Sequence, residues 1–282
     1  MDIFNEIGPL KAFLRLKKIG FNSIGFVPTM GALHQGHISL IEASRTENSI
    51  TVCSIFVNPA QFNNPADLAK YPRTLESDIV LLEKANCDIL FCPETSQMYS
   101  SQSQVIFDFG KLDKMMEGHY RPGHFSGVAL VVSKLLHIVS PDRAYFGQKD
   151  YQQFKIIEKL VTDLKFDVSL QCMPIKREPD GLAMSSRNAR LARDQRNKAP
   201  VFYQSLGQAK SLLRQGNSMK DVRTLIVKKF ESIRDVKLEY LELVDTANLT
   251  PIENVSDTAI LLIAGYVGEI RLIDNLLMTD AD

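Results

Sequence analysis

The stretch from residue 24 to residue 47 most strongly constrains how this chain can fold. It begins with an apolar run that predicts a buried strand within residues 22–27, and residues 28–31 (PTMG) then end that strand. An amphipathic helix is predicted to follow over residues 36–47. A strand, a tight turn and a helix N-terminus together favour anion binding, because the first backbone N–H groups of a helix have no intrahelical partner and the helix dipole is positive there.

Two histidines, His34 and His37, stand at the start of this predicted helix with Gly36 between them. A spacing of three places both imidazoles on one helix face, where they can reach the same ligand. Gly36 has no side chain, so a nucleotide can approach the backbone closely. A single histidine near a helix start is more often a cap or a surface residue, but this pair at a strand–turn–helix junction favours a phosphate-binding role.

Strands and helices alternate through the first part of the chain. The predicted strands are 22–27, 49–57, 88–92, 104–109, 143–147 and 166–172, and the predicted helices are 9–18, 36–47, 74–86, 126–138 and 150–164. Several strands are nearly continuous apolar runs, as expected for parallel strands covered on both faces. We therefore expect a doubly wound, Rossmann-like parallel sheet domain of the α/β class, with ligands at the carboxyl ends of its strands.

The pattern changes after Pro174. Polar helices are predicted at 189–215 and 218–232, and strands at 236–244, 258–264 and 268–273, with a hairpin turn at 265–268. These elements indicate a smaller α+β C-terminal domain. We place the two domains at residues 1–175 and 176–282, and expect the second to close over the active site.

Composition and charge limit the classes of protein. The 282 residues include 33 basic and 33 acidic side chains, and this balance argues against nucleic acid as the main partner. The four cysteines form no C-x-x-C pair and are expected to be reduced, mostly buried thiols of a cytoplasmic protein rather than a zinc site. With neither a leader segment nor an apolar run long enough to span a bilayer, no membrane association is expected.

Two neutral amides follow the second predicted strand. Asn58 and Gln61 can both donate and accept hydrogen bonds, so they suit a substrate with hydroxyl groups and a carboxylate. The pair Asn58-Pro59 also fits an ordinary turn, and for Asn58 both interpretations stay open. Gln61 has no such turn-making role.

The segment 118–127 is rich in glycine but lacks the Lys-Ser/Thr pair that a Walker-type NTPase requires. A glycine-rich turn that opens a helix still offers backbone amides to an anion. Arg121 within it could clamp a phosphate or pair across a subunit contact, and the sequence does not separate these alternatives.

Residues 146–153 run from a predicted strand into a helix. Gly147 permits a close approach, and Lys149 carries a compact positive charge suited to phosphates, although most lysines are solvated surface residues. Asp150 can cap the helix or hold a ribose hydroxyl, and Gln153 lies one turn further on and faces the same way.

A polar loop at residues 180–188 (DGLAMSSRN) opens the second domain. It places two hydroxyls, of Ser185 and Ser186, beside the guanidinium of Arg187. This arrangement is similar to the M-S-K-S loop that class I aminoacyl-tRNA synthetases close over ATP phosphates. A mobile loop here would exclude water from a reactive intermediate.

Taken together, these segments resemble the pantoate–β-alanine ligase family, within the H-x-G-H nucleotidyl-transferring α/β superfamily. The matching stretches are PTMGALHQGH (28–37), FVNPAQF (56–62), YPR (71–73), RPGHFSGV (121–128), PDRAYFGQKDYQQ (141–153) and DGLAMSSRN (180–188). They span most of the first predicted domain and reach into the second.

The resemblance implies a reaction in two steps. ATP and pantoate first give an enzyme-bound pantoyl adenylate and pyrophosphate, and the amine of β-alanine then attacks the acyl carbon to release pantothenate and AMP. The partners implied are these small-molecule substrates and a second copy of the chain in a homodimer. ATP is a substrate, and Mg²⁺ is expected to arrive on its phosphates.

Negative charge develops on the leaving pyrophosphate in the first step, and His34, His37 and Lys149 can meet it as catalytic residues. By resemblance, His37 is the proton donor, Gln61 and Gln153 hold pantoate, and Gln61 also lies near β-alanine. The residues implied to line ATP fall into three groups: Met30, Gly31, Ala32, Leu33, His34, Gln35, Gly36 and His37; Gly147, Gln148, Lys149 and Asp150; and Lys176, Met184, Ser185, Ser186 and Arg187.

Two positions depart from the family's pattern. Lys176 stands where the family usually has a small aliphatic residue near the adenine, so only its backbone would serve the base. Ser77 stands where relatives often have an acid, next to Asp78, and we therefore assign no protein ligand to Mg²⁺.

Three other functions compete with this interpretation. An adenylyltransferase that moves AMP to a phosphate would not need two glutamine-bearing substrate segments. A tRNA-binding synthetase relative is disfavoured by the neutral charge and the lack of a recognisable anticodon domain. A catalytically dead nucleotide sensor is disfavoured because every polar residue of the motifs is intact.

Overall fold

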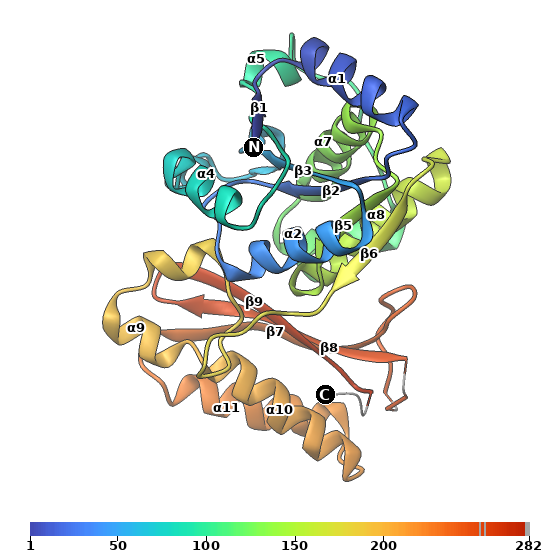
Figure 1. Cartoon of the computed structure of the whole chain (residues 1–282). Helices are drawn as coiled ribbons and strands as arrows, with labels where there is room; N and C mark the ends of the chain where they lie inside the picture. Colours follow the sequence, from blue (N-terminus) through green and yellow to red (C-terminus); the bar gives the residue numbers. More distant parts are fainter. Residues whose placement is uncertain (254, 257, 280–282) are drawn as a thin grey trace. The chain divides into compact units, whose positions relative to one another are not determined.

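The computed structural model describes residues 1–253, 255–256 and 258–279. The chain forms two compact units: the first contains Met1–Gly147 and Gln152–Pro174, and the second contains Gln148–Tyr151 and Ile175–Asp282. The turn at residues 148–151 thus groups with the C-terminal part of the chain, although it is flanked on both sides by the first unit. Figure 1 shows the elements of both units.

The first unit is built on a six-stranded parallel sheet in the order β1-β4-β3-β2-β5-β6. Its strands are β1 (Asp2–Phe4), β2 (Ile24–Thr29), β3 (Ile50–Ile55), β4 (Ile89–Phe91), β5 (Arg143–Gly147) and β6 (Ser169–Met173). The longer helices are α1 (Ile7–Ile19), α2 (Gln35–Glu47), α4 (Leu75–Lys84), α7 (His124–Val139) and α8 (Tyr151–Leu164). Short helical segments are η1 (Pro59–Gln61), α3 (Pro65–Ala69), α5 (Thr95–Met98), η2 (Gly110–Asp113) and α6 (Glu117–Tyr120).

Apolar side chains cover both faces of this sheet. Phe26 and Val52 belong to one core cluster, which they share with apolar residues of α1, α7 and α8. Their neighbours in sequence, Val27 and Cys53, belong to a second cluster with residues of α2 and α4. Because successive side chains of a strand point to opposite faces, the apolar runs fill both clusters. The doubly wound α/β fold expected from the sequence is confirmed.

The order of the strands reverses between β2 and β5. The chain runs from β2 outward through β3 and β4 on one side, and from β5 to β6 on the other. Gly25 pairs with Arg143 and Phe26 with Ala144, so the two strands lie side by side and point the same way. In open parallel sheets, ligands bind at such a reversal, outside the carboxyl ends of the strands. Here those ends lead into residues 30–33 and towards residues 148–150.

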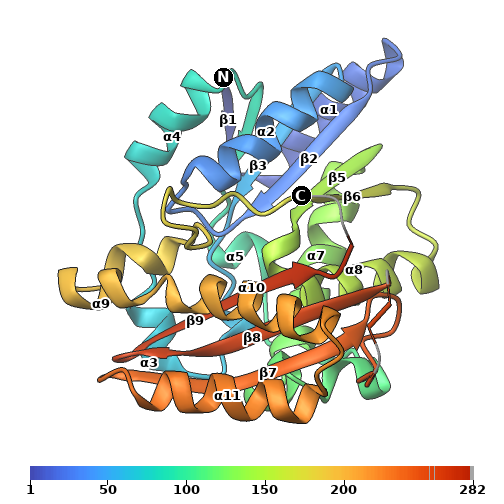
Figure 2. The same cartoon turned by 90° about the horizontal axis from the view of Figure 1, so that it is seen from below.

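The second unit is a three-stranded antiparallel sheet with two helices packed against it. Its strands are β7 (Val236–Asp245), β8 (Ala259–Val267) and β9 (Ile270–Leu277), and its helical segments are η3 (Gln148–Asp150), η4 (Ser186–Arg190), α9 (Arg193–Lys198), α10 (Val201–Arg214) and α11 (Met219–Glu231). Figure 2 shows α10 and α11 running along the strands. Phe202 and Phe230 meet edge to face at 5.2 Å between ring centroids, and with Leu241 and Ile263 they help form one core. The predicted α+β character of this part is confirmed.

The predicted strand at 104–109 is wrong. These residues adopt no regular structure, the backbone N–H of Phe107 donates to the Ser126 hydroxyl, and Val105 and Ile106 are exposed. A strand needs a neighbouring strand as hydrogen-bond partner, and the place beside β4 is taken by β1. Strand β1 has only three residues, too few to show a period of two, so the local sequence does not predict it.

Two predictions in the second unit also need correction. The single helix expected at 189–215 is broken into η4, α9 and α10; Pro200 separates the last two, because proline has no N–H to donate and its ring clashes with the preceding turn of a helix. The hairpin turn lies at residues 268–269 rather than 265–268, and Gly265 is an interior residue of β8 paired with Leu272. No helix among the described residues is long and apolar enough to cross a bilayer.

Candidate active site

The two histidines form a reciprocal cap at the start of α2. His34 is the N-cap residue, and its Nδ1 accepts a hydrogen bond from the backbone N–H of Gly36 at 3.1 Å. The Nδ1 of His37 accepts the backbone N–H of His34 at 3.3 Å, and the two rings lie 4.0 Å apart between centroids. A neutral imidazole that accepts at Nδ1 carries its proton at Nε2. The pair therefore caps the helix, and each ring has the tautomer that donates from its outer nitrogen.

The turn between β2 and α2 is held by a buried carboxylate. Gly31 and Ala32 have positive φ angles of 79° and 49°, so this turn adopts a backbone conformation that costs energy for a residue with a side chain. Asp78 on α4 accepts the backbone N–H of Ala32 at 2.9 Å and that of Leu33 at 2.8 Å, and its side chain is almost fully buried. These two hydrogen bonds to a buried side chain fix the turn that precedes the histidines.

From the sequence alone, Asp78 is only the acid next to Ser77, and no role is predicted for it. The structure shows that both oxygens of its carboxylate accept backbone N–H groups. An acid at this point of a helix is common for electrostatic reasons, since it complements the helix dipole. No local signal in the sequence joins it to a turn 45 residues earlier.

Gln61 lies at the end of η1, the short helical turn that follows β3. Its side-chain amide donates to Met30 Sδ at 3.0 Å, so the structure brings together one predicted pantoate residue and one predicted ATP residue within the first unit. Its oxygen accepts from Asn58 Nδ2 at 3.1 Å. Gln61 is 7% exposed, and its amide is thus held in a defined orientation at the edge of the sheet.

Asn58 is used entirely inside the protein. Its Nδ2 also donates to the carbonyl of Gly127 at 3.1 Å, while its Oδ1 accepts from the Tyr99 hydroxyl at 2.7 Å and from the N–H of Ala60 at 3.3 Å. The contact with Ala60 belongs to a turn, whereas those with Gly127 and Tyr99 come from distant parts of the chain; a contact of Asn58 with substrate stays a prediction. Burial raises the pKa of Tyr99 to about 12, so its hydroxyl stays a donor in this network.

The glycine-rich segment 118–127 packs against the turn that carries Gln61. His124 Nδ1 lies 2.8 Å from the carbonyl oxygen of Gln61. A Cβ at Gly127 would stand 2.1 Å from the carbonyl oxygen of Ala60, so only glycine allows η1 to approach α7 this closely. Arg121 forms an ion pair with Glu117 at 3.7 Å, one helical turn away.

Lys149 lies in η3, in the second unit. Its side chain is 17% exposed and its Nζ is 3.7 Å from Asp150 Oδ2. The helix predicted to begin at 150 begins at Tyr151, so Asp150 belongs to the preceding 3₁₀ turn. Gln153 follows on α8 and is half-buried, and it belongs to the first unit.

The predicted phosphate loop starts as a short hairpin. The N–H of Met184 donates to the carbonyl of Lys176 at 3.0 Å, and Arg177 pairs with Ala183 in a bridge. Ser185 then caps η4 by accepting the N–H of Arg187 at 3.2 Å. Lys176 itself is exposed. Ser185 thus immediately precedes η4, and Ser186 is the first residue of that 3₁₀ helix.

An ion pair fixes the tip of this hairpin. Arg196 donates to both oxygens of the Asp180 carboxylate, at 2.5 and 3.2 Å, and this contact lowers the pKa of Asp180 below its ordinary value. The residues at the tip are therefore tied to α9.

The predicted ATP-binding residues fall in both units. Those of the first group, residues 30–37, belong to the first unit, as do Gln61, Gln153 and Gly147. Gln148, Lys149, Asp150, Lys176, Met184, Ser185, Ser186 and Arg187 lie in the second unit. Across the described ranges, no group of three or more His, Cys, Asp or Glu side chains is arranged as a metal site.

The whole length of the chain is similar to known proteins of one family. The family model described as pantoate-beta-alanine ligase matches residues 2–277. Among curated proteins, the pantothenate synthetase of Cytophaga hutchinsonii is 46% identical over 281 residues, covering 99% of each chain, and that of Thermosipho melanesiensis is 48% identical over 278 residues, covering 95% of this chain and 98% of the relative.

Solved structures of the same family are also similar to this chain. The crystal structure of pantothenate synthetase from Thermus thermophilus has a TM-score of 0.92 and 40% identity, with 99% of this chain and 100% of that chain covered. A pantoate-beta-alanine ligase from Francisella tularensis, solved as a complex with beta-gamma ATP and beta-alanine, has a TM-score of 0.80 and 36% identity, with 99% and 98% covered.

Proposed function

Because this chain belongs to the pantoate–β-alanine ligase family, we propose that it joins pantoate to β-alanine and cleaves ATP to AMP and pyrophosphate, through a pantoyl adenylate held on the enzyme. The product is pantothenate. The observation that carries the proposal is the capped histidine pair at the N-terminus of α2, at the reversal of strand order between β2 and β5.

The first step transfers the adenylyl group to the pantoate carboxylate. A carboxylate oxygen attacks the α-phosphorus, the bond from that phosphorus to the bridging oxygen breaks, and pyrophosphate leaves with the bonding electrons. His37 donates the proton that the leaving group needs, from the Nε2 side of the ring. The N-terminus of α2, His34 and Lys149 stabilise the negative charge as it develops.

Two glutamines hold pantoate in this scheme. Gln61 presents an amide whose orientation is fixed by Asn58, and Gln153 presents a second amide from α8. An amide both donates and accepts, as recognition of a hydroxyl beside a carboxylate requires. In the second step β-alanine binds near Gln61, its amine attacks the acyl carbon, and AMP leaves.

The ATP-binding set includes residues of the second unit. Ser185, Ser186 and Arg187 bind the phosphates, and Gln148 and Asp150 line the nucleotide beside Lys149. Met184 and the backbone of Lys176 serve the adenine. The second domain, residues 176–282, closes over the bound intermediate and protects the adenylate from water.

Mg²⁺ enters with the phosphates of ATP. Asp78, the acid next to Ser77, supports this part of the proposal, because both of its carboxylate oxygens already accept backbone N–H groups. When bound, the ion would neutralise charge on the phosphates and so assist the departure of pyrophosphate.

The protein acts as a homodimer in the cytoplasm. The exposed apolar side chains of Val105 and Ile106, 58% and 81% exposed, support an association of two copies. The four free cysteines support a reducing compartment. Light scattering coupled to size-exclusion chromatography tests the dimer, and a monomer at micromolar concentration would contradict it.

The reaction is tested by incubating the protein with ATP, Mg²⁺, pantoate and β-alanine and detecting pantothenate and AMP by mass spectrometry. Without β-alanine, one equivalent of pyrophosphate per site is expected, together with enzyme-bound pantoyl adenylate. Release of pyrophosphate with an acceptor phosphate in place of pantoate would instead show an adenylyltransferase of the phosphate-accepting kind.

A further inference from the structure

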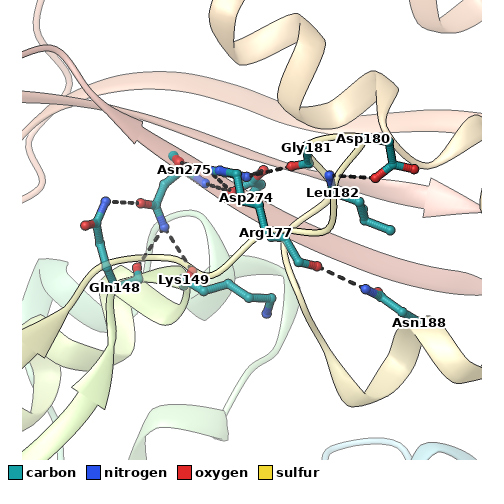
Figure 3. A network of polar contacts seen from close by, with 10 residues as sticks. Gln148, Lys149, Arg177, Asp180, Gly181, Leu182, Asn188, Asp274 and Asn275 are labelled. Carbon is teal, nitrogen blue, oxygen red and sulfur yellow. Dashed lines mark hydrogen bonds and ion pairs between the residues drawn. The ribbon is translucent and has the colours of Figure 1, made fainter. Parts of the chain in front are cut away.

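Asn275 makes three hydrogen bonds to the segment that carries Lys149. Its Nδ2 donates to the carbonyl oxygen of Gln148 at 2.8 Å and to that of Lys149 at 2.9 Å, and its Oδ1 accepts from Gln148 Nε2 at 3.0 Å. Figure 3 shows this clamp. Asn275 lies on β9, 126 residues further along the chain than Lys149, and is 1% exposed. Both N–H groups of the amide are therefore used on adjacent carbonyls of η3.

The backbone of Asn275 is itself held on both sides. Its N–H donates to Asp274 Oδ1 at 2.7 Å, and its carbonyl accepts from Arg177 Nη2 at 3.2 Å. Arg177 closes the network by binding Asp274 in a bidentate pair, at 2.7 and 3.1 Å. Asp274 is 4% exposed and the Arg177 side chain is half-buried, and in this geometry the guanidinium and carboxylate satisfy each other.

The same guanidinium reaches the serine-bearing loop. Arg177 Nη1 donates to the carbonyl of Gly181 at 3.1 Å, at the tip of the hairpin that precedes Ser185, and its guanidinium carbon lies 3.8 Å from the centre of the Tyr203 ring. The turn that carries Lys149 and the start of the serine loop are thus attached to one hydrogen-bonded network, in which Asp274 and Asn275 are buried (Figure 3). Both segments carry residues that the proposed function assigns to ATP phosphates.

The geometry points to Asn275 as a positioning residue for Lys149 in adenylate formation: by holding the carbonyls of Gln148 and Lys149, it directs the Lys149 ammonium at the phosphates of ATP. This inference rests on the proposed function. Asn275 does not touch the substrate in this scheme, and its effect passes through Lys149. Fixing a charged group in advance matters because a displacement of about 1 Å at the reacting centre costs about a hundredfold in rate.

A double-mutant cycle on the adenylation step tests this coupling. Pyrophosphate release is measured in single turnover with pantoate and ATP for the parent, Asn275→Ala, Lys149→Ala and the double variant. We expect Asn275→Ala to slow release by about tenfold to a hundredfold in the parent. In the Lys149→Ala background the same substitution should change the rate by less than about threefold.

Two further measurements separate positioning from general damage. Attack of β-alanine on supplied pantoyl adenylate should stay within about threefold of the parent in Asn275→Ala, because that step does not expel pyrophosphate. The matched control is Asn217→Ala, which removes a similar amide-to-carbonyl bond, from Asn217 Nδ2 to Leu212 at 2.9 Å, at an exposed place in the same unit. It should leave both steps unchanged. If Asn275→Ala does not fold, Asn275→Ser keeps one donor and completes the same cycle.

The outcomes are distinguishable. Equal losses from Asn275→Ala with and without Lys149, or equal losses in both half-reactions, would show a structural role alone and overturn the inference. A parent protein that releases no pyrophosphate with pantoate and ATP would refute the proposed function itself. A parent that does so, beside an Asn275→Ala variant of unchanged rate, would refute only the positioning role.

Discussion

The carboxylate of Asp78 accepts the backbone N–H of Leu33 at 2.8 Å, across 45 residues of sequence. Asp78 also accepts the backbone N–H of Ala32 at 2.9 Å, so its two hydrogen bonds hold the turn that precedes the histidine pair. The turn contains two residues of positive φ, and its conformation needs such external support.

Replacing Asp78 by asparagine should therefore loosen this turn. The amide keeps one acceptor but turns an NH₂ group towards a backbone N–H, so we expect a loss of about 1.5–3 kcal/mol in the free energy of unfolding and a raised KM for ATP. Denaturant unfolding and steady-state kinetics measure the two effects. Glu76→Gln, at an exposed site in the first turn of the same helix, is the matched control. Unchanged stability and KM in Asp78→Asn would contradict this role of Asp78.

Substitution of His37 should harm the first half-reaction more than the second. Because His37 also accepts the N–H of His34, His37→Ala removes a capping bond and should cost about 1 kcal/mol of stability as well. His37→Asn places an oxygen near the position of Nδ1 and so keeps the cap while removing the proton donor. Both variants should slow pyrophosphate release in single turnover and leave amine attack on supplied adenylate less affected. Equal losses in the two steps would exclude His37 as the acid of the first.

Lys149→Ala should lower the rate of adenylate formation by roughly two to three powers of ten, the usual scale for deleting one group that stabilises developing charge. Single-turnover pyrophosphate release is again the measurement. Lys159→Ala removes a lysine whose side chain is 54% exposed on α8 and should change nothing. A Lys149→Ala rate within about threefold of the parent would remove this residue from the site.

Gly147→Ala tests whether a nucleotide approaches the end of β5. A Cβ at this position would meet no atom within 4 Å, and the residue has no positive φ, so the folded protein should accept the methyl group without loss of stability. Bound ATP would meet it, and we expect KM for ATP to rise by about tenfold, or about 1.4 kcal/mol. Gly207→Ala on α10, where a Cβ also meets nothing within 4 Å, is the control. Unchanged KM in Gly147→Ala would place the nucleotide elsewhere.

The rate at which the cysteine thiols are alkylated should show how deeply Cys87 and Cys172 are buried. Burial raises the pKa of Cys87 to about 12 and that of Cys172 to about 11. At about pH 8 only about one Cys172 in a thousand is then a thiolate, so iodoacetamide should label the native protein slowly and the denatured protein at four sites. Intact-mass spectrometry counts the labels. Rapid labelling of Cys87 and Cys172 in the native protein would contradict their burial.

The raised thiol pKa values also determine in which direction the free energy of unfolding changes at high pH. A thiol whose pKa is raised in the folded state keeps its proton while the unfolded chain, with a pKa near 9, releases it. For Cys172 the free energy of unfolding should therefore fall as the pH rises from about 9 to about 11. Denaturant titrations of the parent and of Cys172→Ala across this range should show the smaller slope in the variant, and identical slopes would argue against the shift.

The local sequence pattern predicts an element correctly where the structure of that segment depends mainly on its own residues. The apolar runs around Phe26 and Val52 predicted strands covered on both faces, because a period of two and a continuous apolar run each leave a visible trace. The spacing of His34 and His37 predicted two rings on one helix face; the rings do lie 4.0 Å apart, but His34 is the N-cap residue, with an extended backbone outside the helix. Their reciprocal capping of that helix was not foreseen, since it depends on the backbone conformation of His34.

The pattern failed where the outcome depends on a partner far along the chain. Residues 104–109 are rich in β-branched and aromatic side chains, as strands often are, but the edge of β4 that a strand would need is occupied by β1. A strand exists only with its neighbour, and sequence periodicity does not say which of two candidates will take the place.

Strand, turn and helix order, the class of fold and the chemical character of the histidine, lysine and serine segments follow from the amino-acid sequence, because periodicity, capping and turn chemistry act over a few residues. The attachment of Asp78 to the backbone of Leu33, and of Asn275 to that of Lys149, became visible only in three dimensions. The hydrogen-bond partner of a single aspartate or asparagine cannot be read from the local sequence, because the packing of distant elements decides which backbone group lies beside it.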